Sequence, residues 1–249
     1  MKKYGLIGYP LGHSFSIDYF NRKFREENID ARYVNFELQN ISELKLILNE
    51  NPDLNGLNVT LPYKVAVMNL LDDIDNDARR IGAVNVISIR KAAFGRIKLK
   101  GYNTDVIGFT KSIEALLKPS HRRALILGSG GSSKAVRYAL KQLGVEPTIV
   151  SRTDRDFCIR YDEITPDTMS RYTVIVNCTP VGMHPNAQQC PNIPYDCITP
   201  DHLLYDLLYN PEETLFMQKG KARGATVTNG LEMLLLQAFA SWEIWNRPG

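Results

Sequence analysis

The sequence predicts an α/β protein of two domains, and three observations support this class. Strand patterns and helical patterns alternate over residues 5–60. A strand, a glycine turn and a helix follow one another over residues 123–143, and a strongly apolar helical segment closes the chain at residues 231–245. Alternation of strands with helices is typical of parallel sheets that helices cover. A chain of 249 residues is long enough for two such domains.

The first domain is expected to combine a parallel α/β unit with a hairpin. Strands are predicted at residues 5–8, 33–36 and 56–60, the last ended by Pro62. Apolar residues at helical spacing predict a helix from Ser16 to about Asn28 and a second helix capped by Ser42. The hairpin strands are predicted at residues 83–90 and 96–102.

The second domain is expected to begin after a bridging helix at residues 106–117. Its strands are predicted at residues 123–127, 148–150, 174–176 and 203–206, with a further one near Val227. The closing helix is expected to return and pack on the first domain. The predicted domains are therefore residues 1–103 with 229–249, which would bind the substrate, and residues 104–228.

Composition and charge exclude several classes of protein. Hydrophobic residues make up 44% of the chain, which is enough for a core, and a net charge of +3 is too small to indicate nucleic acid or a membrane surface. The apolar run after the basic N-terminus is cut by Gly5, Gly8 and Pro10, so it is too short for a signal peptide. The four cysteines form no C-x-x-C pair, so we expect reduced cytoplasmic thiols and no metal site.

The glycine turn predicts a dinucleotide site in a Rossmann-like domain. Gly128, Gly130, Gly131 and Ser132 follow an apolar strand and precede a helical pattern, which is the context that gives such a motif its meaning. Glycines let the backbone approach a pyrophosphate, and the helix N-terminus offers unpaired N–H groups and the positive end of a dipole. The alternative is a glycine turn in an ordinary βα unit.

The end of the following strand predicts NADP as the cofactor. Sites that prefer NAD usually have an acidic residue there, which binds the ribose 2′-hydroxyl. This chain instead has Arg152 and Thr153, with Arg155 nearby, and these side chains would attract a 2′-phosphate. The alternative is that Arg152 is simply solvated.

A dehydrogenase also needs a group that moves the proton of the alcohol, and Lys64 is the candidate. It lies just beyond a predicted strand, where α/β sheets place their ligands, and Asp105 could hold its ammonium group in place. The alternatives are a solvated lysine and an aspartate that only caps the helix beginning near Val106.

Two hydroxyl groups near the first helix are candidates for binding a carboxylate. Ser14 and Ser16 lie close to free N–H groups at the predicted helix start, which suits an anionic ligand. The alternative is that Ser16 is only the N-cap of that helix.

Motifs along the whole chain, in the same order, are similar to those of the shikimate dehydrogenase family. They comprise the glycine loop, Gln237 and residues 8–16, 58–64, 82–85, 101–108, 151–153, 177–183, 206–211 and 229–234. The resemblance implies an NADP-dependent oxidoreductase that reduces 3-dehydroshikimate to shikimate, a step toward chorismate and the aromatic amino acids. Compared with this family, residues 153–171 are short, so a helix of the cofactor domain is expected to be shortened or missing.

The resemblance also implies a role for each site residue. Lys64 and Asp105 would be the catalytic pair. The substrate would be bound by Ser14, Ser16, Thr60, Asn85, Tyr209 and Gln237. NADP would be bound by Gly128, Gly130, Gly131, Ser132, Arg152, Thr153, Arg155, Thr179, Met183 and Gly230.

Two rival functions remain open on the sequence. One is an enzyme that accepts quinate as well as shikimate, possibly with NAD, although Arg152 argues against NAD. The other is a non-catalytic sensor of a hydroxy acid or nucleotide, against which the retention of both Lys64 and Asp105 argues. We expect a cytoplasmic monomer or homodimer that binds neither nucleic acid nor membranes.

Overall fold

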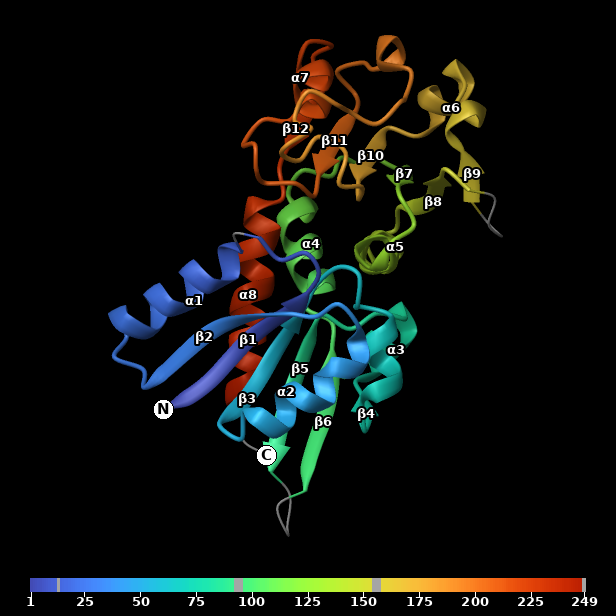
Figure 1. Ribbon diagram of the computed structural model, residues 1–249. Coiled ribbons are helices and arrows are strands. Elements are labelled where there is room, and N and C mark those ends of the chain that lie inside the picture. Colours follow the sequence, from blue (N-terminus) through green and yellow to red (C-terminus); the bar gives the residue numbers. More distant parts are fainter. Residues whose placement is uncertain (13, 92–95, 154–157, 248–249) are drawn as a thin grey trace. The chain divides into compact units, whose positions relative to one another are not determined.

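The computed structural model describes residues 1–12, 14–91, 96–153 and 158–247, and it confirms a mixed α/β protein (Figure 1). The chain divides into two compact units, each with its own six-stranded sheet. The first unit contains Met1–Thr104 and Ala238–Gly249, and the second contains Asp105–Gln237.

The sheet of the first unit has the order β2-β1-β3-β5-β6-β4. Its strands are β1 (Lys2–Gly8), β2 (Ala31–Glu37), β3 (Leu54–Val59), β4 (Asp73–Ile74), β5 (Val86–Lys91) and β6 (Ile97–Tyr102). Strand β1 pairs in parallel with β2 and β3, whereas β5 pairs antiparallel with both β3 and β6. The predicted parallel unit and the predicted hairpin are thus both present, although the hairpin turn at residues 92–95 lies outside the described residues.

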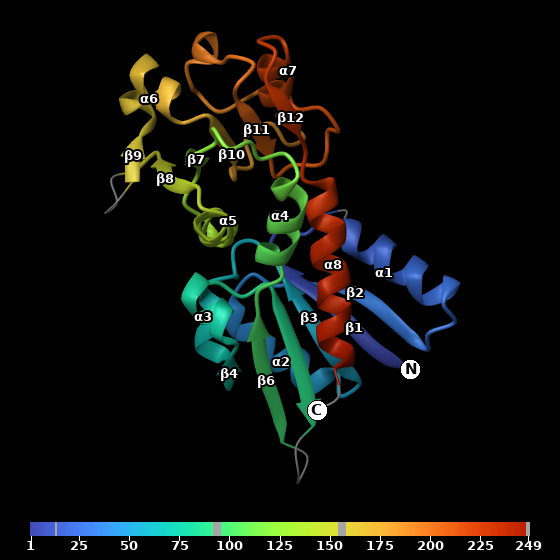
Figure 2. The same ribbon diagram turned by 180° about the vertical axis from the view of Figure 1, so that it is seen from behind.

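Helices cover both faces of this sheet (Figures 1 and 2). One face packs against α1 (Phe15–Glu26) and the end of α8 (Leu231–Asn246), and the other packs against α2 (Leu44–Glu50) and α3 (Asn76–Ile81). Trp245 of α8 donates its indole N–H to the carbonyl of Ile87 at 3.1 Å, and its ring fills the space where a side chain on Gly56 would lie. These contacts confirm that the closing helix packs on the first unit.

Both helix starts predicted in this unit differ from the observed ones. Helix α1 begins at Phe15, so Ser16 lies inside it. Before α2 the chain forms a short 3₁₀ helix at Ile41–Glu43, whose cap is Asn40 rather than Ser42. The Asn40 side chain accepts from the Ser42 N–H at 3.0 Å, while Glu43 accepts from the Asn40 N–H at 2.7 Å. This reciprocal capping box satisfies two N–H groups, which a cap at Ser42 would not.

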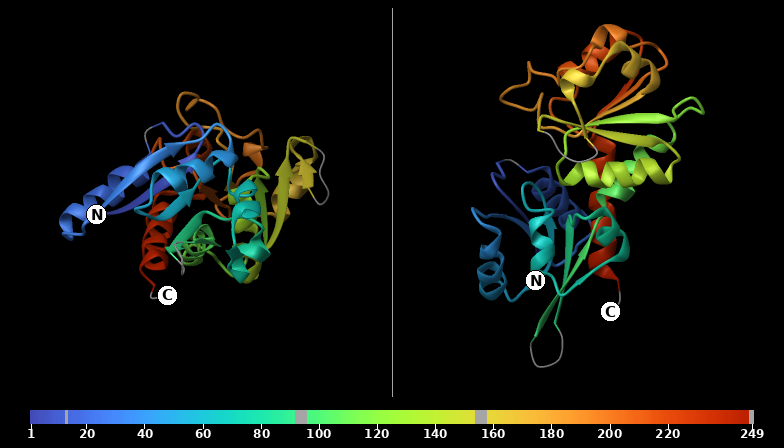
Figure 3. Two further views of the ribbon diagram at one scale, coloured as in Figure 1. Left: turned by 60° about the horizontal axis from the view of Figure 1, so that its bottom comes forward. Right: turned by 90° about the vertical axis from the view of Figure 1, so that its right-hand side faces the viewer.

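The second unit is a doubly wound parallel sheet (Figure 3). Its strands are β7 (Arg123–Leu127), β8 (Glu146–Ser151), β9 (Cys158–Arg160), β10 (Val174–Asn177), β11 (Leu203–Asp206) and β12 (Thr226–Thr228). Their order is β12-β11-β10-β7-β8-β9, and each neighbouring pair is parallel. Read from the β9 edge this is the 3-2-1-4-5-6 order of dinucleotide-binding folds, which reverses direction between β7 and β10 and places ligands there.

The helices of this unit are α4 (Asp105–Glu114), α5 (Gly131–Gln142), α6 (Pro166–Arg171), α7 (Leu215–Lys221) and the first part of α8. Among the described residues between β8 and β10, only a 3₁₀ turn at Tyr161–Glu163 and the six-residue α6 are helical, as the short sequence of this region predicted.

The division between the two compact units falls within α8, so residues 231–237 belong to the second unit. The reason is close packing on α4: a Cβ atom on Gly108 would lie 2.5 Å from the Met233 carbonyl oxygen and 3.2 Å from the Gln237 Cβ. Only glycine permits this approach of the two helices.

Candidate active site

The first unit gathers its candidate residues where β1 and β3 end. The Tyr9 N–H donates to the Leu61 carbonyl at 3.0 Å, so the loops that follow the two strands are joined. A Cβ atom on Gly8 would lie 2.5 Å from the Thr60 side chain, so glycine is needed for this approach. Carboxyl ends of neighbouring parallel strands are the usual ligand-binding edge of such a sheet.

The two serines before and within α1 have different environments. Ser14 occupies the cap position, but its side chain makes no capping bond. Ser14 is only 9% exposed, and its hydroxyl oxygen is buried with no hydrogen-bond partner among the described residues. A buried hydroxyl without a partner costs free energy unless a ligand or water satisfies it. Ser16 is the second residue of the helix, so the alternative that it is the N-cap is wrong.

Thr60, Lys64 and Asn85 lie on the same edge of the sheet. Thr60 and Lys64 are half-buried in the loop after β3, which the backbone holds through bonds from Thr60 N to Ile7 and from Val84 N to the Lys64 carbonyl. Asn85 directly precedes β5 and is buried. Its side-chain oxygen accepts from the Thr104 N–H at 2.7 Å, and its NH₂ group donates to the Thr104 hydroxyl at 3.0 Å.

The other candidate substrate residues belong to the second unit. Asp105 is the buried first residue of α4, so it lies inside the helix rather than before it. Tyr209 is half-buried in the loop after β11. The Gln237 side chain donates to the Leu234 carbonyl within α8 at 3.0 Å.

The glycine loop after β7 fits a dinucleotide pyrophosphate. Gly128 has φ +103°, which favours glycine, and a Cβ atom there would lie 2.9 Å from the Thr179 side chain. The loops after β7 and β10 therefore meet at the point where the strand order reverses. A side chain at Gly130 would meet nothing within 4 Å, and no side chain of the described residues caps α5. The first-turn N–H groups of the buried Gly131 and the half-buried Ser132 lie at the positively polarised end of this helix.

The end of β8 presents the side chains predicted to select the cofactor. Arg152 and Thr153 are exposed directly after this strand. The Ser151 hydroxyl accepts from the Thr153 N–H at 3.3 Å, which stabilises the turn. Arg155 lies outside the described residues.

A buried polar network, to which the sequence assigned no role, joins the loops after β10 and β11. Asn177 ends β10 and accepts from both the N–H and the hydroxyl of Thr179, at 3.1 and 2.6 Å. Its NH₂ group donates to Asp206 at the end of β11 at 3.0 Å. Asp206 also accepts from Leu208 N at 3.0 Å and from the Thr214 hydroxyl at 2.6 Å. The sequence feature that could have indicated this network is that each of the two apolar strands ends in a polar residue, Asn177 or Asp206.

This network supports the segments that carry the remaining candidates. Thr179 and the exposed Met183 lie in the loop after β10. The Gly230 N–H donates to the Leu208 carbonyl at 2.9 Å, and a side chain at Gly230 would collide with the Leu207 carbonyl. The candidate cofactor-binding residue Thr179 therefore hydrogen-bonds directly to Asn177. Gly230 is linked to Asp206 through Leu208, which bonds to both.

Burial raises the pKa of the Asp206 carboxyl from 3.8 to about 6, against the hydrogen bonds from Thr214, Leu208 and Asn177 that lower it. Between these values the folded protein holds the proton more tightly than the unfolded chain, so stability falls as pH rises from about 4 to about 6, by about 3 kcal/mol. We therefore expect Asp206→Asn, which resembles the neutral carboxyl, to raise Tm at pH 8 by roughly 5–10 °C. Below pH 4 the difference should vanish. Thermal unfolding at both pH values checks this, and a lower Tm of the variant at pH 8 would contradict it.

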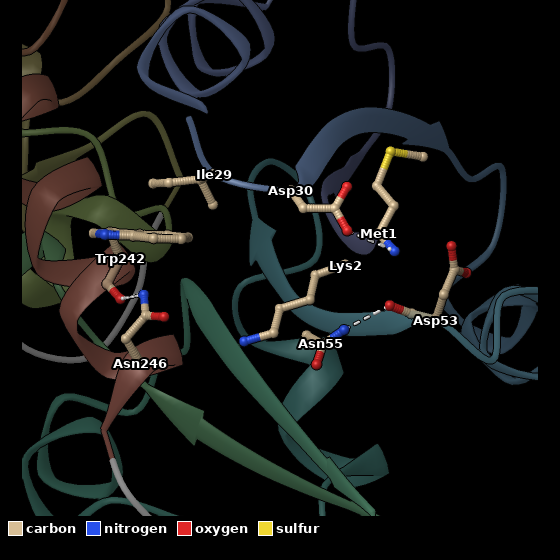
Figure 4. A pocket seen from close by; sticks show the side chains of 8 residues that line it. All are labelled: Met1, Lys2, Ile29, Asp30, Asp53, Asn55, Trp242 and Asn246. Carbon is tan, nitrogen blue, oxygen red and sulfur yellow. Dashed lines mark hydrogen bonds and ion pairs between the residues drawn. The ribbon is translucent and has the colours of Figure 1, made fainter. Parts of the chain in front are cut away.

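A surface cavity of about 500 Å³ lies at the opposite edge of the first sheet, near the N-terminal ends of β1 and β3 (Figure 4). It is lined by Met1, Lys2, Ile29, Asp30, Asp53, Asn55, Trp242 and Asn246. None of the candidate residues is among them, so the chemistry of the site gives this cavity no role.

Two classes of feature are absent from the described part of the chain. No cluster of three or more His, Cys, Asp or Glu side chains there could hold a metal ion. None of the helices described has the length and apolar character needed to cross a membrane.

Comparison with known proteins gives one consistent result. Residues 6–87 match the model of the shikimate dehydrogenase substrate-binding domain. The chain is 37% identical to the shikimate dehydrogenase (NADP(+)) of Carboxydothermus hydrogenoformans, over 97% of this chain and 90% of the relative. The structure of shikimate dehydrogenase from Aquifex aeolicus superposes with a TM-score of 0.86 at 35% identity, covering 99% of this chain and 92% of the other. Shikimate 5-dehydrogenase from Thermus thermophilus, solved with NADP(H) and shikimate, gives a TM-score of 0.84 at 29% identity, covering 99% and 94%.

Proposed function

Because the chain belongs to the shikimate dehydrogenase family, we propose that it reduces 3-dehydroshikimate to shikimate with NADPH and catalyses the reverse reaction. It is an NADP-dependent oxidoreductase that acts on a CH–OH group, in the pathway to chorismate and the aromatic amino acids. The observation that supports this most strongly is the presence of both halves of such an enzyme in one chain. A doubly wound sheet with Arg152 after β8 accompanies a second sheet whose edge bears Ser14, Lys64 and Asn85.

The second unit fits NADP. The N-terminus of α5 and the glycines at 128, 130 and 131 would hold the pyrophosphate, and Arg152 and Thr153 would hold the 2′-phosphate. We assign Ser132 and Thr179 to the same site, and Met183 and Gly230 to its nicotinamide end. When bound, NADP supplies the acceptor of the hydride.

Lys64 of the first unit supplies the proton chemistry in this proposal. Lys64 holds the proton that the substrate oxygen gains on reduction, and its ammonium group stabilises the developing alkoxide charge. Asp105 orients that ammonium group. Ser14 and Ser16 bind the substrate carboxylate, and Thr60, Asn85, Tyr209 and Gln237 bind the rest of the ring. Fixing an anionic ring at both ends holds the reacting carbon in one position.

The experiment that tests this function measures absorbance of reduced nicotinamide, with shikimate and quinate each combined with NADP and NAD. We expect rapid turnover of shikimate with NADP and slower turnover in the other three combinations. Turnover of quinate at a similar rate would favour the broader quinate/shikimate enzyme. No turnover in any combination would favour a sensor.

Ser14→Ala is expected to raise the KM for shikimate about tenfold or more, because hydrogen bonds to charged groups contribute about 1.5–3 kcal/mol. The KM for NADP should stay within twofold. Steady-state kinetics and thermal unfolding check this together, with Ser42→Ala, an exposed serine at the start of a helical turn, as the control. An unchanged KM for shikimate with a lower Tm would show that Ser14 serves only the fold.

The assembly and location of the protein stay predictions. We propose a cytoplasmic enzyme that works as a monomer or homodimer on a small-molecule substrate. Light scattering of the purified protein at several concentrations distinguishes the two assemblies.

A further inference from the structure

A network of buried polar side chains crosses the core of the first unit. It is formed by residues of three elements, Tyr33 (β2), Asn58 (β3) and Ser241 (α8), and by two loop residues, Asn85 before β5 and Thr104 after β6. Each of these residues is at most 5% exposed. Polar groups in such a position are stable only when they are hydrogen-bonded.

The hydrogen bonds of this network have defined donors and acceptors. The Tyr33 hydroxyl donates to the Asn58 side-chain oxygen at 2.8 Å, and the Asn58 NH₂ group donates to the Ser241 oxygen at 3.0 Å. The Ser241 and Thr104 hydroxyl oxygens are 3.3 Å apart. Since Ser241 already accepts from Asn58, its own proton can be donated to Thr104.

Both ends of this hydrogen-bonded network reach residues that are candidates for binding the substrate. At one end, Thr104 bonds to both atoms of the Asn85 amide, which sets the orientation of that amide. At the other end, the Ser16 hydroxyl interacts with the Tyr33 phenol and lowers its pKa, against burial, which raises that pKa far above its ordinary value. Ser16 is expected to bind the substrate carboxylate and Asn85 a hydroxyl of the ring.

We propose that Ser241 and Tyr33 are positioning residues that hold Ser16 and Asn85 at one fixed spacing, so that the carboxylate and a hydroxyl of the substrate are bound together. This inference rests on the proposed function, because the ligand in question is shikimate.

The surroundings of the network support a positioning role over a purely structural one. The Tyr33 ring stacks on Phe20 with centroids 4.7 Å apart, and Trp245 lies against both. Apolar side chains in place of Asn58 and Ser241 would extend this core without the cost of burying polar groups. A connected polar network instead specifies a single arrangement of the groups that it joins.

The second unit offers a matched control. Ser112 on α4 and Tyr205 on β11 are also a buried serine and a buried tyrosine, and their hydroxyl oxygens lie 2.7 Å apart. Removing one of these hydroxyls should cost similar stability to removing the hydroxyl of Tyr33 or Ser241. Only the network of Tyr33 and Ser241 leads to Ser16 and Asn85.

The test compares Ser241→Ala and Tyr33→Phe with Ser112→Ala and Tyr205→Phe. We expect the first two variants to raise the KM for shikimate about tenfold, which is the effect of losing one well-positioned hydrogen bond. The KM for NADP should stay within twofold, and the two control variants should keep both constants. The double variant Tyr33→Phe/Ser241→Ala should have a KM for shikimate little higher than that of either single variant, because both substitutions break the same hydrogen-bonded network.

The result that would overturn the inference is a KM for shikimate that changes no more in Ser241→Ala and Tyr33→Phe than in the controls. If Ser241→Ala does not fold, Tyr33→Phe alone decides, since it removes one oxygen atom without changing the ring. A wild-type enzyme that does not oxidise shikimate would instead overturn the proposed function, and this inference with it.

Discussion

Lys64→Ala is expected to lower kcat for shikimate oxidation by roughly two to four orders of magnitude, the range typical of a lost general acid–base. Substrate binding should change less, because Ser14, Ser16 and Asn85 still hold the ring. Asp105→Asn should lower kcat in the same direction, since it keeps the shape of the side chain and removes the charge that orients the ammonium group. The measurements are kcat at saturating NADP and shikimate, and substrate affinity by calorimetric titration.

Lys45→Ala provides the control for this prediction, because Lys45 is exposed on α2 and has no candidate role. It should have the kcat of the wild type. If Lys64→Ala turns over at the normal rate, or if only its KM rises, Lys64 binds the substrate and moves no proton.

Arg152→Ala is expected to raise the KM for NADP by roughly 10- to 100-fold and to leave the KM for NAD unchanged. Hydrogen bonds from a guanidinium to a phosphate are charge-assisted and contribute about 1.5–3 kcal/mol. NAD has no 2′-phosphate, so it cannot lose this contact. Initial rates over a range of each cofactor, at saturating shikimate, give the two constants.

The matched control is Arg171→Ala, an exposed arginine on α6 that pairs with Asp167 at 2.6 Å. Neither cofactor constant should change in it. Equal losses with NADP and NAD in Arg152→Ala would show that this arginine does not contact the 2′-phosphate.

Local sequence patterns predicted most of the fold. The apolar run at 123–127, the glycines after it and the helical spacing to residue 143 are short-range signals, and the structure has β7, the loop and α5 there. The helix starts were less predictable, since Ser16, Ser42 and Asn40 are all residues that favour caps. Which of them caps a helix depends on the residue at which the preceding strand ends. That position is set by the tertiary fold.

The position of a candidate residue was predictable where the residue lies just beyond its own strand. Lys64 after β3 and Arg152 after β8 are of this kind. The supporting networks were not predictable, because they join distant positions. Ser241 and Asn58 are 183 residues apart in the sequence, and no spacing within either segment indicates the other. The pairing of Asn177 with Asp206 likewise follows from the register of β10 and β11.

The most direct test of the central claim follows the hydrogen atom itself. Shikimate deuterated at the carbon that bears the reacting hydroxyl is oxidised with NADP, and the reduced cofactor is then analysed by mass spectrometry. Direct transfer between the bound substrate and NADP predicts a cofactor that is one mass unit heavier, with no deuterium released to water. Unlabelled reduced cofactor, or deuterium found in the solvent, would contradict the account.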